Sequence, residues 1–214
     1  MFLKSLDING FKSFADKTHI EFSDGITSLL GPNGCGKSNI VDSIKWVLGE
    51  QSTKTLRAGK MEDVIFNGND KRKPLQFAEV TLTIDNSEHN LPSDVTEIEI
   101  KRRIFRSGES EYYLNRTRCL LKNIRELFFD TGVGKSAYSI LEQGKIDQIL
   151  SSKPEDRRYI FEEAAGISRF KVECNEAQRK IERTDENITQ FESLIKVEKR
   201  SYDSLKAQAE KARS

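Results

Sequence analysis

The sequence predicts an α/β protein in two parts: a globular lobe with a mixed sheet and an antiparallel β-layer over residues 1–166, then one arm of a coiled coil over residues 167–214. Three observations predict this fold. A complete G-x-x-x-x-G-K-[ST] motif occupies residues 31–38, between an apolar run and a helical pattern. Alternating apolar and polar residues between positions 77 and 114 are typical of antiparallel strands with one wet face. Beyond the lobe, apolar residues recur with a period of about 3.5, which indicates a left-handed coiled coil.

Composition excludes several classes of protein. Charged residues make up 32% of the 214 residues and hydrophobic residues 36%, so the core is modest. The net charge of +1 gives no overall attraction to nucleic acid or an anionic membrane, so such contacts would need local patches. Cys35, Cys119 and Cys174 form no C-x-x-C pair, which favours reduced thiols over a disulfide framework. Because no signal sequence or membrane-spanning apolar stretch occurs, we expect a cytoplasmic protein with no membrane partner.

The first elements lead into and out of the motif. We expect strands at residues 2–8 and 19–22. Apolar residues 26–30 predict a buried parallel strand that enters the motif. Residues 39–48 come next as a helix, whose apolar positions 40, 41, 44, 47 and 48 lie on one face.

The later elements build the β-layer and the segments after it. Alternation predicts three antiparallel strands, at residues 77–86, 95–105 and 111–114. Helical spacing predicts a short helix at residues 120–129, and residues 138–142 predict a strand. Pro154 fixes φ for the start of a further helix, with acidic residues in its first turn.

The motif at residues 31–38 has the residue types that a phosphate-binding loop needs. Backbone N–H groups must turn inward around a polyphosphate, and this requires glycine where φ is positive or where a Cβ would clash. Lys37 supplies a point charge for the β- and γ-phosphates, and Ser38 supplies a hydroxyl for Mg²⁺. The alternative is a chance glycine-rich turn, but the order strand, loop, helix favours phosphates at a helix N-terminus. We therefore expect ATP and Mg²⁺ to bind through Pro32, Asn33, Gly34, Cys35, Gly36, Lys37, Ser38 and Asn39.

The C-terminal part carries a narrow apolar seam. Its members alternate spacings of four and three, and only Thr184 and Glu198 interrupt it. A single amphipathic helix packed on the lobe is the alternative, but such helices usually carry a wider apolar face. The seam needs a partner helix, which these residues do not supply elsewhere. Its positions are 170, 174, 177, 181, 184, 188, 191, 195, 198, 202, 205, 209 and 212.

Part of the chemistry of ATP hydrolysis is missing from the sequence. A phosphate loop needs an acidic Mg²⁺ partner and a group that activates water. The nearest candidate is the run at residues 127–130, which ends in Asp130, but Thr131 and Gly132 come after it and the run predicts a helix end. No Ser-Gly-Gly signature that could hold a second nucleotide occurs. The chain therefore looks like one part of an ATPase, and we expect it to be inactive alone.

With these residues in view, the chain resembles the N-terminal half of a structural maintenance of chromosomes (SMC) ATPase of the bacterial or archaeal kind. The phosphate loop alone is shared by many NTPases, whereas the combination of segments is far more specific. The segments that carry the resemblance are residues 10–14, 31–39, 45–52, 56–68, 112–115, 130–134, 138–146 and 160–167.

The resemblance implies an architecture and a set of partners. In that family the chain folds back, so that its N- and C-terminal halves build one ABC-type ATPase head at the end of an antiparallel coiled coil. It implies that the Walker B carboxylates, the signature and the catalytic glutamate lie in the C-terminal half of the same chain. It also implies a homodimer of two heads around ATP, a kleisin subunit at the head-proximal coiled coil, and a nucleoid-associated role on double-stranded DNA.

The resemblance also assigns roles to individual residues. It implies that Gln143 is the glutamine near Mg²⁺ and the attacking water. It implies that Arg57 approaches the nucleotide and links its state to DNA. Lys12 and Ser13 would lie near the nucleotide. Cys35 stands where serine is commoner in the family, but the position contributes mainly backbone, so we expect binding to be retained. On spacing alone, Gln143 could be a polar strand end and Arg57 a solvated loop charge.

Basic residues suggest where DNA would bind. They gather at residues 71–73, at 101–103 with Arg106, and at Arg116, Arg118, Lys122 and Arg125. A run of charge is usually a solvated face, and acidic residues are equally frequent in this chain. The candidate DNA contacts are Arg57, Lys60, Arg118 and Lys122.

Three other functions compete with the SMC interpretation. A DNA-repair ATPase of the Rad50 or RecN type shares the phosphate loop, the glutamine loop and the coiled coil. The segments at residues 11–14 and 160–166 favour an SMC protein. A transporter nucleotide-binding domain would place a compact helical domain after Gln143, where a heptad arm occurs instead. A purely structural coiled coil with a degenerate head is disfavoured by the intact phosphate loop.

Overall fold

The computed structural model describes residues 2–128, 140 and 168–213. The chain divides into two compact units, residues 1–166 and 167–214, and each is described by itself. The strand expected at residues 138–142, apart from Ile140, and the helix expected from Pro154 lie outside the described residues, as does Gln143.

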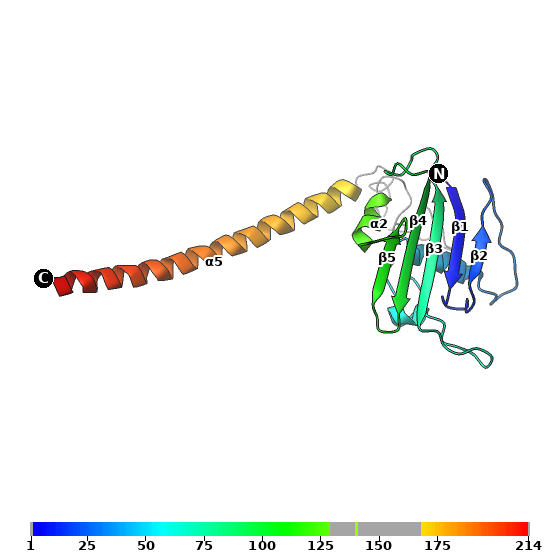
Figure 1. Cartoon of the computed structure of the whole chain (residues 1–214), viewed down its shortest axis with the longest axis horizontal. Coiled ribbons are helices and arrows are strands. Elements are labelled where there is room, and N and C mark those ends of the chain that lie inside the picture. Colours follow the sequence, from blue (N-terminus) through cyan, green and yellow to red (C-terminus); the bar gives the residue numbers. More distant parts are fainter. Residues whose placement is uncertain (1, 129–139, 141–167, 214) are drawn as a thin grey trace, which may run out of the picture. The chain divides into compact units, whose positions relative to one another are not determined.

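The first unit is built on a six-stranded sheet with the order β2-β1-β3-β4-β5-β6, and every neighbouring pair in it is antiparallel (Figure 1). The predicted β-layer is therefore confirmed, with strand ends within about two residues of those expected. The short strand β6 was not predicted. It comes after a two-residue turn in which Asn115 and Arg116 both have positive φ, as tight hairpin turns require. The strands are β1 Phe2–Asn9, β2 Thr18–Glu21, β3 Phe77–Asp85, β4 Glu97–Phe105, β5 Ser110–Leu114 and β6 Thr117–Cys119.

One face of the sheet holds the core. In β4 every second side chain is buried, as alternation predicts for a strand with one wet face, and β3 follows the same pattern except that Thr81 is buried as well. Helix α1 (Lys37–Val47) packs against β3 and β4. It buries Trp46 and Val47, together with the polar residues Asp42 and Ser43. The expected apolar face is largely confirmed: Val47 and Leu48 are buried in the core, and Ile40 and Ile44 are partly buried against it. The buried face also extends to Trp46 and to the polar residues Asp42 and Ser43.

The far end of α1 is fixed by two arginines. Arg102 of β4 donates hydrogen bonds to the carbonyls of Trp46 and Glu50 at 2.7 and 2.8 Å. Arg125, from helix α2 (Leu121–Leu127), donates to the Gly49 carbonyl at 2.9 Å. Cations at a helix C-terminus bind its free carbonyls and oppose its dipole. The sheet and α2 thus hold the helix whose other end carries the phosphate loop.

Residues 26–30 are not a strand, and this prediction was wrong. The Ile26 side chain is 98% exposed and that of Leu30 is 90% exposed. A parallel strand must pair on its edges and be covered on both faces. Among the described residues, none of the six strands pairs with this segment. The local apolar pattern was recognised correctly, but the neighbours that would turn it into a strand are absent from the described part.

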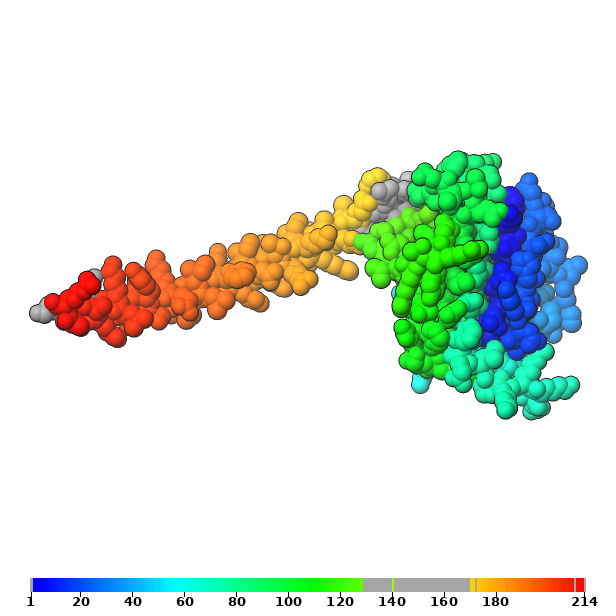
Figure 2. All heavy atoms as spheres, in the orientation of Figure 1, coloured from blue at the N-terminus to red at the C-terminus, as the bar shows by residue number. Residues whose placement is uncertain are grey.

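The second unit is one helix, α5 (Ser168–Arg213), of 46 residues. The helix confirms the coiled-coil prediction at the level of secondary structure, and Figure 2 shows it as a slender rod with no second described helix beside it. At about 1.5 Å per residue it is about 69 Å long. Within this unit the seam is exposed. Its large exposed members are Phe170, Ile181, Ile188, Phe191, Ile195, Tyr202 and Leu205.

Candidate nucleotide site

The phosphate loop ends at Gly36, directly before α1. Gly34 and Gly36 have φ of +84° and +100°, in the region that favours glycine. A Cβ at Gly36 would also make a tight contact, 3.0 Å from Ser13 Oγ, so both the backbone conformation and the available space disfavour a larger residue. Gly36 is the N-cap of α1, and no side chain caps this helix end. Free N–H groups and the positive end of the helix dipole therefore face the loop, as an anion site requires.

Lys37 folds back over the loop. Its Nζ donates to the carbonyls of Gly31 and Pro32 at 2.5 and 2.7 Å, and it lies 3.8 Å from Cys35 Sγ. The ammonium group therefore lies on the loop that it is expected to serve. A phosphate oxygen could replace these carbonyls as its acceptor, because the side chain is long and flexible.

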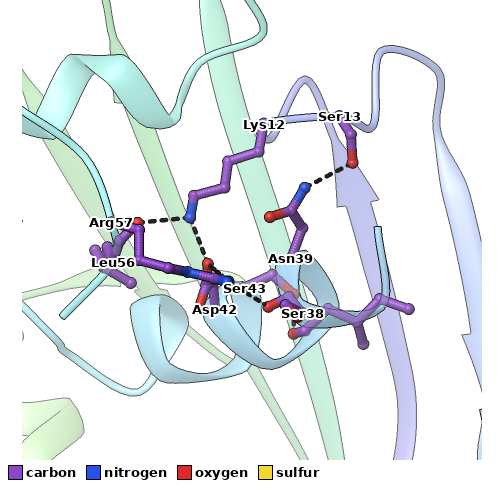
Figure 3. Close-up of polar contacts among 9 residues, drawn as sticks. Lys12, Ser13, Ser38, Asn39, Asp42, Ser43, Leu56 and Arg57 are labelled. Atoms are coloured by element: carbon purple, nitrogen blue, oxygen red, sulfur yellow. Dashed lines mark hydrogen bonds and ion pairs between the residues drawn. The ribbon is translucent and has the colours of Figure 1, made fainter. Parts of the chain in front are cut away.

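A buried carboxylate joins three segments beside the loop (Figure 3). The Asp42 side chain, on α1, is 2% exposed and accepts hydrogen bonds from Lys12 Nζ and, at 2.5 Å, from an Arg57 nitrogen. Lys12 Nζ also donates to the Leu56 carbonyl at 2.6 Å. The same Arg57 nitrogen lies 3.2 Å from the Ser38 carbonyl, to which it donates. Two basic residues from different loops are thus held against the first turns of α1.

Sequence reasoning missed Asp42. A signal was present, because Asp42 lies four residues after Ser38 and therefore one helical turn beyond it, on the same side of α1. Figure 3 shows its carboxylate between Lys12 and Arg57. A carboxylate on a helix that packs against a sheet must find cationic partners, since an unpaired buried charge is costly.

The two cationic residues share an unusual backbone. Lys12 has φ +49° and Arg57 has φ +50°, in the left-handed region that non-glycine residues seldom adopt. Each such residue costs on the order of 1 kcal/mol, so the surrounding contacts must hold it there. Strained residues of this kind cluster at functional sites, which supports a functional role for both.

A hollow of about 480 Å³ opens beside this cluster. Three residues that the sequence had marked, Lys12, Asn39 and Arg57, line it together. Ser13 is tied to them, because Asn39 Nδ2 donates to Ser13 Oγ at 2.8 Å. Asp63, which the sequence had not marked, also lines the hollow. The remaining lining residues are Ile65, Phe66, Asn67 and Gly68.

The candidate DNA residues Lys60, Arg118 and Lys122 differ in whether a carboxylate lies close to the side-chain charge. Lys60 is exposed and precedes the short 3-10 helix η1 (Met61–Val64). Arg118 lies 3.6 and 3.7 Å from the carboxylates of Glu109 and Glu111. Lys122 lies 3.6 Å from Glu126. These pairs reduce the positive charge that Arg118 and Lys122 offer to a phosphate backbone.

Of the basic run at residues 101–103, Arg102 is buried and takes no part in a surface patch. Because strand side chains alternate between faces, Arg102 points into the core while Arg103 points outward. Arg103 Nε and NH2 donate to one carboxylate oxygen of Glu79 at 2.8 and 2.5 Å. Arg106 donates to the backbone carbonyls of Phe66 and Leu75.

Within the described ranges, no group of three or more His, Cys, Asp or Glu side chains could hold a metal ion. None of the described helices is long and apolar enough to cross a membrane.

Comparison with known proteins gives consistent matches. The family model of the RecF/RecN/SMC N terminal domain matches residues 2–198. The chain is 53% identical to the chromosome partition protein Smc of Clostridium kluyveri over 212 residues, which is 99% of this chain but 18% of that relative. The chain therefore spans about a fifth of the length of the curated relatives that it matches.

Solved structures agree with this match. A Pyrococcus furiosus Smc head domain with an extended coiled coil, bound to the C-terminal domain of ScpA, has a TM-score of 0.73 and 33% identity; the alignment covers 98% of this chain and 55% of that one. A structure from work on ATP-driven dimerization and DNA-stimulated activation of SMC ATPases has a TM-score of 0.70 and 34% identity, covering 77% of this chain and 99% of that one.

Proposed function

Because the chain belongs to the RecF/RecN/SMC N-terminal domain family, we propose that it forms the ATP-binding half of an SMC ATPase head. The observation that carries this proposal is the phosphate loop at the uncapped N-terminus of α1, with Lys12 and Arg57 held beside it by one carboxylate. A polyphosphate needs such a combination of backbone N–H groups, a helix N-terminus and basic side chains.

The residues present fit a nucleotide with Mg²⁺. The phosphates would lie on the backbone of residues 32–39, where Lys37 would exchange its loop carbonyls for phosphate oxygens. Ser38, with Gln143, would hold Mg²⁺, which supplies charge neutralisation at the β- and γ-phosphates. The nucleoside would extend toward the hollow lined by Lys12, Asn39 and Asp63, where a carboxylate can accept hydrogen bonds from a ribose hydroxyl or a base amino group.

Hydrolysis would need groups beyond this chain. We propose that the C-terminal half supplies the acidic Mg²⁺ partner, the catalytic glutamate and the helix that pairs with α5. ATP would then bring two heads together, and hydrolysis would part them. Two features support a second half: the exposed seam of α5, and segment 26–30, which pairs with no strand in the described part of the chain. The work on ATP-driven dimerization of related ATPases supports a second head.

In the cell, this cycle would act on chromosomes. We propose double-stranded DNA and a kleisin subunit as partners, and roles in chromosome condensation and segregation at the nucleoid. The name of the Clostridium kluyveri relative and the ScpA-bound Pyrococcus furiosus head support these partners. The family model also covers RecF and RecN, but the 53% identity with a chromosome partition protein favours the SMC assignment over a Rad50- or RecN-type repair ATPase.

The test is nucleotide binding by the complete head, made from this chain and the C-terminal half. Calorimetry should detect ATP binding in the presence of Mg²⁺, and Lys37→Ala should abolish it, because the loop loses its point charge for the β- and γ-phosphates. Lys71→Ala, on an exposed hairpin outside the site, is the matched control. Equal affinity of the wild type and Lys37→Ala would refute the proposal.

A further inference from the structure

Asp42 is the one buried carboxylate described beside the phosphate loop, and it serves two cations at once. Lys12 Nζ and Arg57 NH2 donate to the same oxygen, Oδ2, although they come from loops on opposite sides of α1 in the sequence. Two cations that share one anion would repel each other if the anion were removed. Their relative placement therefore depends on Asp42 in particular.

Each cation is anchored by only part of its hydrogen-bonding capacity. Arg57 uses NH2 for Asp42 and the Ser38 carbonyl, while its Nε and NH1 make no hydrogen bond to any described residue. Its side chain is 56% exposed. Lys12 uses two of its three N–H groups, on Asp42 and the Leu56 carbonyl. Both residues line the hollow, so their remaining N–H groups can donate hydrogen bonds to an anionic ligand bound there.

The anchor itself is rigid. Asp42 lies in the middle of α1, one turn beyond Ser38, and Arg102 and Arg125 hold the other end of that helix. Groups carried by a packed helix hold their positions better than groups on loops. The left-handed backbones of Lys12 and Arg57 also need contacts that hold them in place, and Asp42 contacts both.

We propose that Asp42 is a positioning residue for nucleotide binding, which holds Lys12 and Arg57 on the wall of the hollow so that their remaining donors meet the oxygens of the nucleotide. The inference rests on the proposed function. Asp42 itself would not touch the nucleotide. By holding Lys12 and Arg57 in place beforehand, it would lower the entropic cost of ordering them when the nucleotide binds.

A simpler role for Asp42, as a negative charge near the phosphates, predicts the opposite effect of Asp42→Asn on ATP affinity. If Asp42 contributed only its negative charge, then Asp42→Asn would remove a repulsion and ATP would bind more tightly. If Asp42 positions the two cations, then Asp42→Asn would weaken binding of Mg²⁺-ATP by about tenfold, because one tenfold step corresponds to the loss of one good charge-assisted hydrogen bond. Affinity is measured by calorimetry on the complete head, with the melting temperature without nucleotide as a check on folding.

A double-mutant cycle separates a positioning role from a general structural one. In an Arg57→Ala background, Asp42→Asn should weaken binding by less than about threefold, because one of the groups that Asp42 positions is already gone. If Asp42→Asn leaves Lys12 without an anionic partner and the head unfolds, the double variant Lys12→Gln/Asp42→Asn is compared with Lys12→Gln alone. That pair keeps a neutral hydrogen bond and still removes the anchor of Arg57.

The outcomes are distinct. Unchanged or tighter ATP binding by Asp42→Asn, or an equal loss with and without Arg57, would overturn the inference while leaving the proposed function intact. Equal binding by the wild type and Lys37→Ala, measured in the same series, would instead overturn the proposed function.

Discussion

The guanidinium of Arg102 lies 4.5 Å from the ring centroid of Trp46 and donates a hydrogen bond to the carbonyl of the same residue. Tyr112 covers it from 5.2 Å. Burial lowers the pKa of Arg102 from its ordinary value to about 10, yet the group stays charged at neutral pH. A single side chain thus fixes α1 to the β-layer, by a cation–π contact with Trp46 and by hydrogen bonds to carbonyls at the C-terminal end of the helix.

We expect Arg102→Met to destabilise the complete head by about 3 kcal/mol, because the change removes charge-assisted hydrogen bonds to two buried carbonyls and a cation–π contact. Arg103→Met is the matched control on the same strand. Arg103 faces outward and pairs with Glu79, so its loss should cost less than about 1 kcal/mol. Urea unfolding measures both, and equal costs for the two variants would contradict this account of Arg102.

His19 gives a pH-dependent contribution to the first two strands. A hydrogen bond to Asp7 at 3.0 Å, and then one to Glu21, raises the pKa of His19 above its ordinary 6.5. Because the folded-state pKa is raised, this stabilisation is fully present below the unfolded pKa and is lost as pH rises through the folded pKa. NMR titration should therefore find the His19 pKa above 6.5.

Two variants rank the causes of that shift. Asp7→Asn should lower the pKa of His19 more than Glu21→Gln does, because the hydrogen bond to Asp7 is the larger cause. A His19 pKa at or below the ordinary value in the wild type, or the reverse order of the two variants, would show that these contacts do not persist in solution.

The candidate DNA contacts can be tested by the salt dependence of binding. Charge reversal at Lys60, Arg118 and Lys122 should weaken binding of the ATP-engaged head to duplex DNA. The logarithmic salt slope should fall by about 0.9 for each phosphate contact that is lost. Charge reversal at Lys17, an exposed residue outside the three basic groups, serves as the control. An unchanged slope in the triple variant would remove these residues from the interface, and the glutamates beside Arg118 and Lys122 would then explain why.

Residues 1–214 alone should not hydrolyse ATP and should associate with themselves. The sequence has no recognisable acidic Mg²⁺ partner for Ser38 and no group that activates water, so we expect stabilisation of the transition state to be incomplete. The seam of α5 exposes a long apolar stripe, which favours association. Ultracentrifugation and a phosphate-release assay test both points. A stable monomer with ATPase activity that Lys37→Ala abolishes would contradict this expectation.

Sequence patterns predicted the elements whose formation depends on the spacing of apolar residues within one segment. Alternation in β3 and β4, the helical spacing of α1 and the seam of α5 all correspond to observed elements. The basic run at residues 101–103 was counted without regard to the two faces of the strand. Positions 98, 100, 102 and 104 all point inward, so Arg102 lies in the core among isoleucines and takes no part in a basic patch.

The features that were missed depend on partners distant in sequence. The apolar pattern at residues 26–30 was clear, but a strand exists only where neighbours accept its hydrogen bonds. Nothing local marks Lys12 and Arg57 for a left-handed backbone, because neither is glycine or asparagine. The convergence of the two on Asp42 joins positions 30 and 15 residues away, which spacing within a single helix cannot show.

The exposure of residues 26–30 has a consequence for the order of events during assembly. The phosphate loop is fastened on its C-terminal side by α1, while its N-terminal side is carried by a segment with no strand neighbour in the described part. We expect residues 1–214 alone to bind nucleotide weakly. Binding should strengthen once the proposed C-terminal half packs against segment 26–30 and holds the N-terminal side of the loop in place. Tight ATP binding would then depend on assembly, so that only a head with both halves in place enters the ATP cycle.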